Sequence, residues 1–390
     1  MMAETPENRS QGLLPAGLSD LMPGDARREA EAISTIMSGF AAFGYERVKP
    51  PLVEFEDTLL ADGPGAVLAA DTFRVMDPQS SRMMAIRADM TAQIARIACT
   101  RLLHMPRPLR LSYSGDVLRV LPDPLNPERQ LTQVGAEMIG ASNVYNDAEL
   151  AVAALNALGR AGVASLTIDL GVPRLLEAIA GEKPDHALAQ AVAAKDHVLV
   201  RQYGGKLVDM LTSLLDVPLL PLEKLDQDVA VMSKGLKPEA ASMITDLLKV
   251  AALIRSAAPE VSVTLDPLES RGFDYHHGVG FSIFAPGIRG ELGRGGRYRT
   301  ATVNGSGEDS TGVTLYLERV MRALPQNHDS NAVYVPFPEG LETLVHLVET
   351  GEICRFGTSG ASDEKTQAEE AAGMGCRRIF RDGKVILLNE

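Results

Sequence analysis

The chain has 390 residues, 45% of them hydrophobic, and a formal net charge of −13. The length predicts two or three domains with a sizeable core, while the acidic charge argues against broad nucleic-acid binding and no apolar run is long enough to cross a bilayer. The polar start, MMAETPENRS, is unlike a secretion or transit signal, and three isolated cysteines suit free thiols, so we expect a cytoplasmic protein without membrane contact, metal site or cofactor.

The N-terminal part is predicted to form a helix followed by short strands. Apolar residues recur at helical spacing over 25–43. The next segment, GYERVKPPLVEF, resembles a strand interrupted by Pro50 and Pro51, which predicts a sheet edge that a second subunit often covers. Residues 72–88 alternate as a hairpin, and Asp89 then opens a helix, most simply by capping its backbone N–H groups.

Two strands are predicted at 109–119 and 131–139, around a proline-rich loop. Period-two alternation in the second strand places Gln133, Gly135 and Glu137 on one face, opposite an apolar core face. The amide and the carboxylate stand about 13 Å apart along the strand, and the glycine between them leaves room for a ligand of amino-acid size. The alternative is a polar face that simply meets solvent.

The middle of the chain alternates between helices and short strands. An alanine-rich helix over 147–161 precedes a strand at 165–170. Residues 172–258 have a helical pattern almost throughout, which indicates an inserted helical subdomain. A strand at 261–265 returns the chain to the sheet.

Polar residues next enter an apolar strand. Residues 270–284, SRGFDYHHGVGFSIF, bring an arginine, a tyrosine and two histidines up to the strand at 279–284, and the glycine-rich run GRGGRYR follows. Because an unpaired buried polar group costs about 1–3 kcal/mol, these side chains need partners. Arg271 and Asp274 could pair with each other in a solvated loop; we favour a pocket floor that presents Arg271 to an anion.

The end of the chain predicts a last sheet strand over 311–319 and a separate small α/β unit over 331–390. The unit has two strand and helix pairs and a closing hairpin across Asp382 and Gly383. Its six basic and ten acidic residues leave a net charge of −4.

Together these motifs resemble histidyl-tRNA synthetase and its paralogue, the regulatory subunit of ATP phosphoribosyltransferase, over residues 12–325. The early helix with the strand ending at Pro51 resembles motif 1 of class II aminoacyl-tRNA synthetases. Residues 116–140, DVLRVLPDPLNPERQLTQVGAEMIG, resemble motif 2, and TGVTLYLER resembles motif 3. RADMT stands at the place of R-P-E-G-T, and RGFDYHH and GGRYR are similar to the histidine-specific segments.

The resemblance implies an α+β fold, with a class II synthetase-like antiparallel sheet flanked by helices. It divides the chain into a flexible tail over 1–11, a catalytic-type domain made of 12–171 and 259–325, a helical insertion over 172–258 and a small C-terminal α/β domain over 326–390. That last domain resembles a reduced anticodon-binding unit, but its acidity is wrong for RNA, so we expect no tRNA partner.

The sequence differs from the synthetases at three places that, in the synthetases, contact ATP. Leu121 replaces the glutamate that reads the adenine amino group, and it has no acceptor. Prolines replace the arginines of the motif 2 loop, and Tyr316 replaces the glycine on which adenine lies. Arg119 and Arg319 remain, yet these losses imply a protein without catalysis of its own. The alternatives are a divergent histidyl-tRNA synthetase and a scaffold that has lost the ligand.

The histidine side of the resemblance is better kept. By resemblance, Gln133 and Glu137 hold the amino group and imidazole of L-histidine, Arg271 faces its carboxylate, and Tyr298 lies beside the ring. The implied protein forms a homodimer through the motif 1-like element, partners a short-form ATP phosphoribosyltransferase catalytic subunit and takes L-histidine as its effector. The predicted histidine-binding residues are Asp89, Thr91, Arg119, Gln133, Glu137, Arg271, Tyr275, His276 and Tyr298.

Overall fold

The computed structural model describes residues 13–61, 64–122, 127–217, 227, 233–273, 275–300, 307–325, 332–360 and 363–388. The predicted N-terminal tail, the centre of the proline-rich loop and Asp274 lie outside the described residues. The chain divides into two compact units, Met1–Pro325 and Gln326–Glu390, and each is described by itself.

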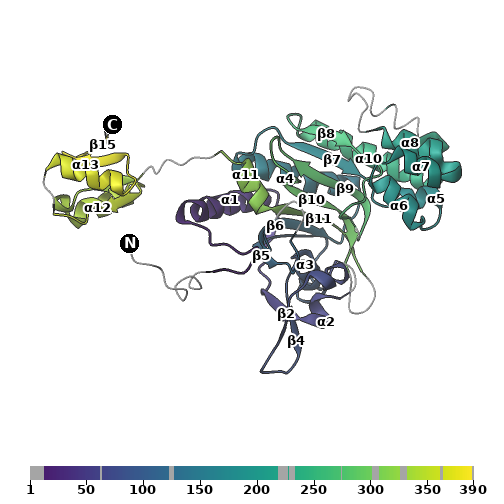
Figure 1. The fold of residues 1–390 in the computed structure, drawn as a ribbon, viewed down its shortest axis with the longest axis horizontal. Coiled ribbons are helices and arrows are strands. Elements are labelled where there is room, and N and C mark those ends of the chain that lie inside the picture. Colours follow the sequence, from purple (N-terminus) through teal and green to yellow (C-terminus); the bar gives the residue numbers. More distant parts are fainter. Residues whose placement is uncertain are drawn as a thin grey trace, which may run out of the picture. The chain divides into compact units, whose positions relative to one another are not determined.

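The first unit is built on a large mixed sheet (Figure 1). In the described part of the chain it has eight strands in the order β1-β5-β6-β11-β10-β9-β7-β8. The six central strands are antiparallel, whereas β1 and β8 lie parallel to their neighbours at the two edges. The strands are β1 Glu46–Arg47, β5 Leu109–Leu118, β6 Gln130–Ile139, β7 Thr167–Gly171, β8 Ser262–Leu265, β9 His276–Phe284, β10 Gly293–Arg299 and β11 Asp309–Tyr316.

The predicted α+β class and the helix-flanked antiparallel sheet are confirmed, and a parallel pair at each edge makes the sheet mixed. Both parallel pairs join strands that are separated by long crossover segments, as parallel neighbours require. The strand at β10 was not predicted from its pattern. Its sequence, GRGGRYR, has no apolar alternation, and the segment is held extended by ladders to β9 and β11 on its two sides.

Helices cover both faces of this sheet, and α4 and α3 lie on opposite sides of it (Figure 1). The core face carries Val134, Ala136 and Met138 of β6, which pack in one apolar cluster with α1, α4 and α10. The other face packs against α3 through Met90, Ile94 and neighbouring residues. The helices are α1 Pro23–Ala42, α3 Thr91–Thr100, α4 Val144–Ala161, α10 Pro238–Ala257 and α11 Leu317–Ala323.

A second, three-stranded sheet in the order β2-β4-β3 follows the first edge strand. The two prolines separate β1, at the edge of the large sheet as predicted, from β2 in the small one. Arg87 donates to the Pro50 carbonyl at 3.2 Å and Gln93 donates to the Pro51 carbonyl at 2.7 Å, which fixes this connection. The elements are β2 Val53–Phe55, α2 Glu56–Leu59, η2 Ala66–Asp71, β3 Arg74–Met76 and β4 Met83–Ile86.

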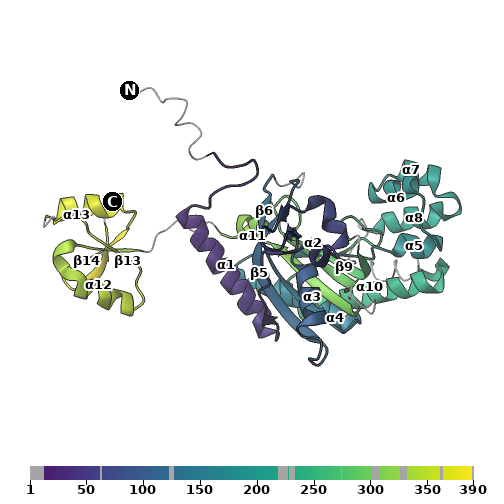
Figure 2. The same cartoon turned by 90° about the horizontal axis from the view of Figure 1, so that it is seen from below.

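The segment predicted to be helical is helical where it is described. Its short helices gather in one group with α10 (Figure 2). None of the helices in the described residues is both long and apolar enough to span a membrane. The group comprises α5 Leu175–Ala180, α6 His186–Ala193, α7 His197–Tyr203, η3 Gly205–Leu207, α8 Val208–Leu215 and η5 Ser233–Gly235.

The second unit is a four-stranded sheet in the order β13-β12-β14-β15 with two helices. The predicted hairpin is present, and Asp382 and Gly383 both have positive φ, at 50° and 75°. Glu370 of α13 accepts hydrogen bonds from Tyr334, Thr358 and Ser359, which ties the loop after β13 to this helix. The elements are β12 Val333–Val335, η6 Phe337–Glu339, α12 Gly340–Glu349, β13 Cys354–Phe356, α13 Glu364–Gly373, β14 Arg378–Arg381 and β15 Lys384–Leu387.

The contact between α1 and α4 yields a stability prediction. A Cβ added at Gly39 would lie 2.7 Å from the Cβ of Ala157, whereas one added at Gly159 of α4 meets nothing within 4 Å. Gly→Ala in a helix gains about 1 kcal/mol of propensity, but overpacking costs about 1–3 kcal/mol. Gly159→Ala should therefore raise the free energy of unfolding in urea and Gly39→Ala should lower it; equal stabilisation by both would contradict this packing.

Candidate functional site

A buried carboxyl group, that of Glu137, lies on the sheet face that packs against α3. In the ladder, Glu137 stands opposite Gly312 of β11, which in turn stands opposite Gly296 of β10. A Cβ added at Gly312 would overlap the Glu137 carboxylate, so this glycine provides the space for it. The predicted alternation of β6, which directs Glu137 away from the apolar core, is confirmed.

Three hydroxyl groups surround the carboxyl group of Glu137, which is fully buried. Thr91 and Tyr113 donate to Oε1 at 3.1 and 3.2 Å, and Tyr298 donates to Oε2 at 2.9 Å. Burial raises the pKa of Glu137 to about 8, the Tyr298 hydrogen bond opposes this, and the negative charge of Asp89 adds to it. The raised pKa therefore favours the protonated form of the Glu137 carboxyl group at neutral pH.

The start of α3 forms a second wall of the site. Asp89 accepts from the backbone N–H of Thr91, the first residue of α3, at 2.8 Å. It thus serves the helix start as predicted, one residue before the N-cap position. Gln133 donates to the other oxygen of Asp89 at 2.7 Å and accepts from the Met90 N–H at 3.0 Å. Gln133 of β6 therefore fixes the position of Asp89 and of the start of α3.

Aromatic rings form a third wall. The Tyr275 ring stacks on the His276 ring at 4.3 Å between centroids and meets the Tyr298 ring edge-on at 5.8 Å. Burial lowers the pKa of His276 to about 3, with a further contribution from the positive charge of Arg294. His276 is therefore a neutral ring in this wall.

The structure brings a different arginine to the site from the one expected. The Arg271 side chain is 65% exposed and forms a two-point ion pair with Glu269, at 2.8 and 3.1 Å. Because that carboxylate is only two residues away, Arg271 stays in its own loop and lies outside the cavity. Arg294 of β10 lines the cavity instead. A side chain at Gly272, whose φ is +75°, would overlap the Arg294 guanidinium.

These walls enclose a narrow cavity of about 30 Å³, which we call the carboxyl cavity. An amino acid needs more room, so binding must widen it. The wall at Tyr275 precedes β9 and lies outside the sheet ladder, which makes it the part that can yield. The carboxyl cavity is lined by Asp89, Thr91, Glu137, Tyr275, His276, Arg294, Gly295, Tyr298, Gly312, Thr314 and Tyr316.

A second cavity of about 190 Å³ adjoins the first, and the two share Arg294 and Tyr316. Arg119 lies here rather than in the carboxyl cavity, with its Nε 3.8 Å from Asp71. Arg319 lies 3.8 Å from the Glu291 carboxylate, and its guanidinium is 5.2 Å from the centre of the Tyr316 ring. We call this space the arginine cavity; it is lined by Arg119, Leu131, Glu291, Arg294, Tyr316, Glu318 and Arg319.

The expected role of Gly135 is not what the structure gives. A Cβ on Gly135 would lie 2.5 Å from the hydroxyl oxygen of Tyr113, so the space above this glycine is filled by the Tyr113 ring and not by a ligand. Tyr113 also exchanges a hydrogen bond with Thr314 at 2.9 Å. Sequence reasoning missed both residues because it could not supply the pairing register between β5, β6 and β11.

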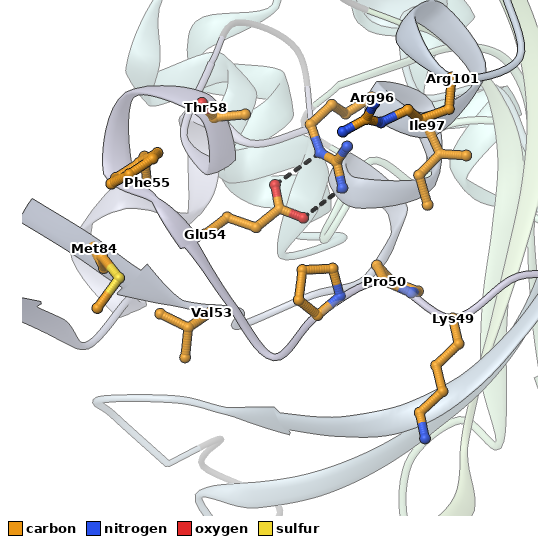
Figure 3. Close-up of a pocket in the computed structure, with 11 residues that line it drawn as sticks. Lys49, Pro50, Val53, Glu54, Phe55, Thr58, Met84, Arg96, Ile97 and Arg101 are labelled. Carbon is orange, nitrogen blue, oxygen red and sulfur yellow. Dashed lines mark hydrogen bonds and ion pairs between the residues drawn. The ribbon is translucent and has the colours of Figure 1, made fainter. Parts of the chain in front are cut away.

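A larger open groove of about 480 Å³ lies between the segment after β1 and α3 (Figure 3). Its carboxylate, Glu54, already pairs with Arg96 at 2.6 Å. Apolar side chains such as Val53, Phe55 and Ile97 form much of its lining, and Lys49 stands at its edge. Convergent polar groups that would fix a small ligand are found in the carboxyl cavity instead. The described residues contain no cluster of His, Cys, Asp and Glu able to hold a metal ion.

The fold is that of a class II, histidyl-tRNA synthetase-like protein. The structure is similar to histidyl-tRNA synthetase from Nostoc sp. PCC 7120, with a TM-score of 0.77, 16% identity and coverage of 96% of this chain and 91% of that one. An ATP phosphoribosyltransferase regulatory subunit/histidyl-tRNA synthetase from Bacillus halodurans C has a TM-score of 0.75, 20% identity and coverage of 95% and 98%. The family profile described as Histidyl-tRNA synthetase matches residues 17–320.

Sequence relatives define the family more narrowly. The chain is 41% identical over 399 residues to the ATP phosphoribosyltransferase regulatory subunit of Rhodospirillum centenum, covering 98% of each. It is 42% identical over 386 residues to that of Paramagnetospirillum magneticum, covering 97% of this chain and 99% of the relative. The chain belongs to the family of ATP phosphoribosyltransferase regulatory subunits, and the resemblance found in its motifs is confirmed.

The raised pKa of Glu137 predicts how stability depends on pH. In the unfolded chain a glutamate ionises near pH 4.3, whereas the folded chain keeps this proton up to about pH 8. The stability that the protonated group contributes is thus fully present below pH 4 and is lost as pH rises to 8. Glu137→Gln removes this loss.

We therefore expect the difference in free energy of unfolding, Glu137→Gln minus wild type, to increase between pH 5 and pH 8.5 when it is measured in urea without histidine. The gain should be on the order of a few kcal/mol, since each pKa unit is worth about 1.4 kcal/mol. A difference between the two proteins that does not change with pH would show that Glu137 titrates normally.

Proposed function

We propose that the chain is a non-catalytic regulatory subunit of ATP phosphoribosyltransferase in histidine biosynthesis, which activates a short-form catalytic subunit and carries feedback inhibition by L-histidine. The observation that carries this proposal is the buried Glu137 carboxyl group inside an aromatic cavity. A carboxyl group can exchange a proton and a hydrogen bond with an imidazole, whereas an apolar ring offers it neither.

The remaining walls suit the rest of a histidine molecule. Asp89 offers a carboxylate to the ligand's ammonium group, and Arg294 offers a guanidinium to its carboxylate. Tyr275 and Tyr298 present ring surfaces to the imidazole. Three kinds of group in one small space favour a zwitterionic amino acid with a polar ring.

The arginine cavity argues against adenylation by this chain. The two arginines that would face phosphate groups, Arg119 and Arg319, already stand near the carboxylates of Asp71 and Glu291. The Tyr316 ring lies at the boundary of the two cavities, where a nucleotide would need to approach the amino acid. Leu121 is 66% exposed and offers no acceptor for an adenine amino group.

The narrow cavity supports a regulatory role. A ligand that must widen its site to enter favours the widened conformation and so shifts the population of states. Such coupling is typically worth about 1–3 kcal/mol and is reciprocal, so the substrates of the catalytic partner should change the affinity for histidine. The free thiols of Cys99, Cys354 and Cys376 suit the reducing cytoplasm in which we place this complex.

The proposal predicts a specific pair of enzymatic results. Co-expressed with a short-form catalytic subunit, the chain should co-elute with it, raise its ATP phosphoribosyltransferase activity and make that activity sensitive to L-histidine. The chain alone should give only background pyrophosphate exchange with histidine and ATP. Robust exchange would instead support the alternative function, a divergent histidyl-tRNA synthetase.

Glu137 is the residue whose replacement should affect histidine most. Glu137→Gln keeps the shape of the side chain but cannot become the carboxylate that pairs with an imidazolium. We therefore expect calorimetry to show histidine binding weakened by roughly 1.5–3 kcal/mol, the range for a charge-assisted hydrogen bond. Glu149→Gln, which loses a surface pair with Arg110, is the matched control and should bind as the wild type. Unchanged affinity of a folded Glu137→Gln protein would remove Glu137 from the site.

We further propose that the chain forms a homodimer through α1 and the segment that contains the two prolines, beside the groove in Figure 3. Light scattering at micromolar concentration should give a dimer for the wild type. Leu52→Glu, which places a charge on a half-exposed apolar residue of this segment, should give a monomer. Val198→Glu, at an exposed position of α7, is the control and should remain a dimer; a monomeric wild type would contradict the proposal.

A further inference from the structure

Arg294 occupies the boundary between the carboxyl cavity and the arginine cavity and lines both. In the ladder it stands opposite Thr314 of β11, which stands opposite Gly135 of β6, so it shares the sheet face of Glu137. Arg294 and Glu137 are two inter-strand spacings apart across the sheet and two residues apart along it, which puts their Cα atoms about 12 Å from each other. Their side chains line the same cavity from two sides, so a single amino acid in a widened cavity would contact both.

The hydrogen bonds of the Arg294 guanidinium leave part of it available. Its Nε donates to Glu291 at 2.8 Å, its Nη2 donates to the same carboxylate, and its Nη1 donates to the Gly272 carbonyl at 2.8 Å. A guanidinium has five N–H groups. Among the described residues three are therefore used, and one N–H on each terminal nitrogen remains. These two N–H groups are available to donate to a ligand carboxylate.

Glu291 is a built-in competitor for this arginine. It lies within reach of both Arg294 and Arg319, and it neutralises Arg294 while the cavity is empty. A ligand carboxylate that binds Arg294 adds a second negative charge there and weakens the hold of Glu291. The contact between Arg294 and Gly272 also links this exchange to the loop that forms the movable wall.

We propose that Arg294, and not Arg271, binds the ligand carboxylate, and that Glu291 limits the affinity by competing for the same guanidinium. The inference rests on the proposed function, since it takes histidine as the ligand. It makes the site selective for an imidazole amino acid over the corresponding amine, because only the amino acid has a carboxylate that can accept from the remaining N–H groups of Arg294. Arg294 is thus the residue that sets this selectivity.

The test measures the binding of L-histidine and of histamine, which lacks the carboxylate, by calorimetry on the full chain. In Arg294→Gln we expect histidine to bind about 10- to 100-fold more weakly, as for a lost charged hydrogen bond, while histamine changes less than about threefold. Arg294→Lys keeps the charge without the guanidinium and should lose less. Arg271→Gln, the matched control, should keep the preference of the wild type for histidine.

Glu291→Gln provides a second test that misfolding cannot imitate. It leaves Arg294 in place and removes the competing charge, so histidine should bind several-fold more tightly while histamine is unaffected. The inference is overturned if Arg271→Gln abolishes the preference while Arg294→Gln retains it, or if Glu291→Gln weakens histidine binding. If the wild type binds no histidine at all, the proposed function itself is contradicted, together with this inference.

Discussion

A carboxyl group buried in the middle of a sheet needs donors, space and a way to stay neutral, and much of this site follows from meeting those needs for Glu137. Hydroxyls from β5, β10 and the start of α3 supply the donors. Gly312 on the neighbouring strand supplies the space. The raised pKa keeps the group protonated when the cavity is empty. Ionising Glu137 without a positively charged partner is therefore costly, and a basic ring beside it could take up its proton.

The arginines next to the carboxyl cavity already have acidic neighbours. Arg119 lies near Asp71, and Glu291 lies near both Arg294 and Arg319. Tyr316 fills the junction between the cavities, where its ring lies under the Arg319 guanidinium. The positive charge of the arginine cavity is therefore held by ion pairs and ring contacts within the chain, whereas the carboxyl cavity keeps convergent polar groups.

Local patterns predicted most of the elements and part of the site. Helical periodicity identified α1 and α4, and period-two alternation placed Glu137 on the face of β6 that lines the carboxyl cavity. Long-range facts escaped prediction. The ladder that brings Arg294 to the cavity depends on the pairing of β10 with β11. The pair between Arg271 and Glu269 is local, but the sequence offered Arg271 more than one partner. Gly135 looked like room for a ligand because the register that fills it with Tyr113 is set by strand pairing between distant segments.

Proton exchange on histidine binding tests the central role of Glu137 most directly. At pH 5.5 free histidine carries a protonated ring, and the account holds that Glu137 is protonated too. An imidazolium paired with a carboxylate needs only one of these two protons, so binding should release about one proton. Calorimetry in buffers of different ionisation enthalpy measures this number. Release of about one proton by the wild type, absent in Glu137→Gln, is the predicted result; binding without proton exchange would contradict the account.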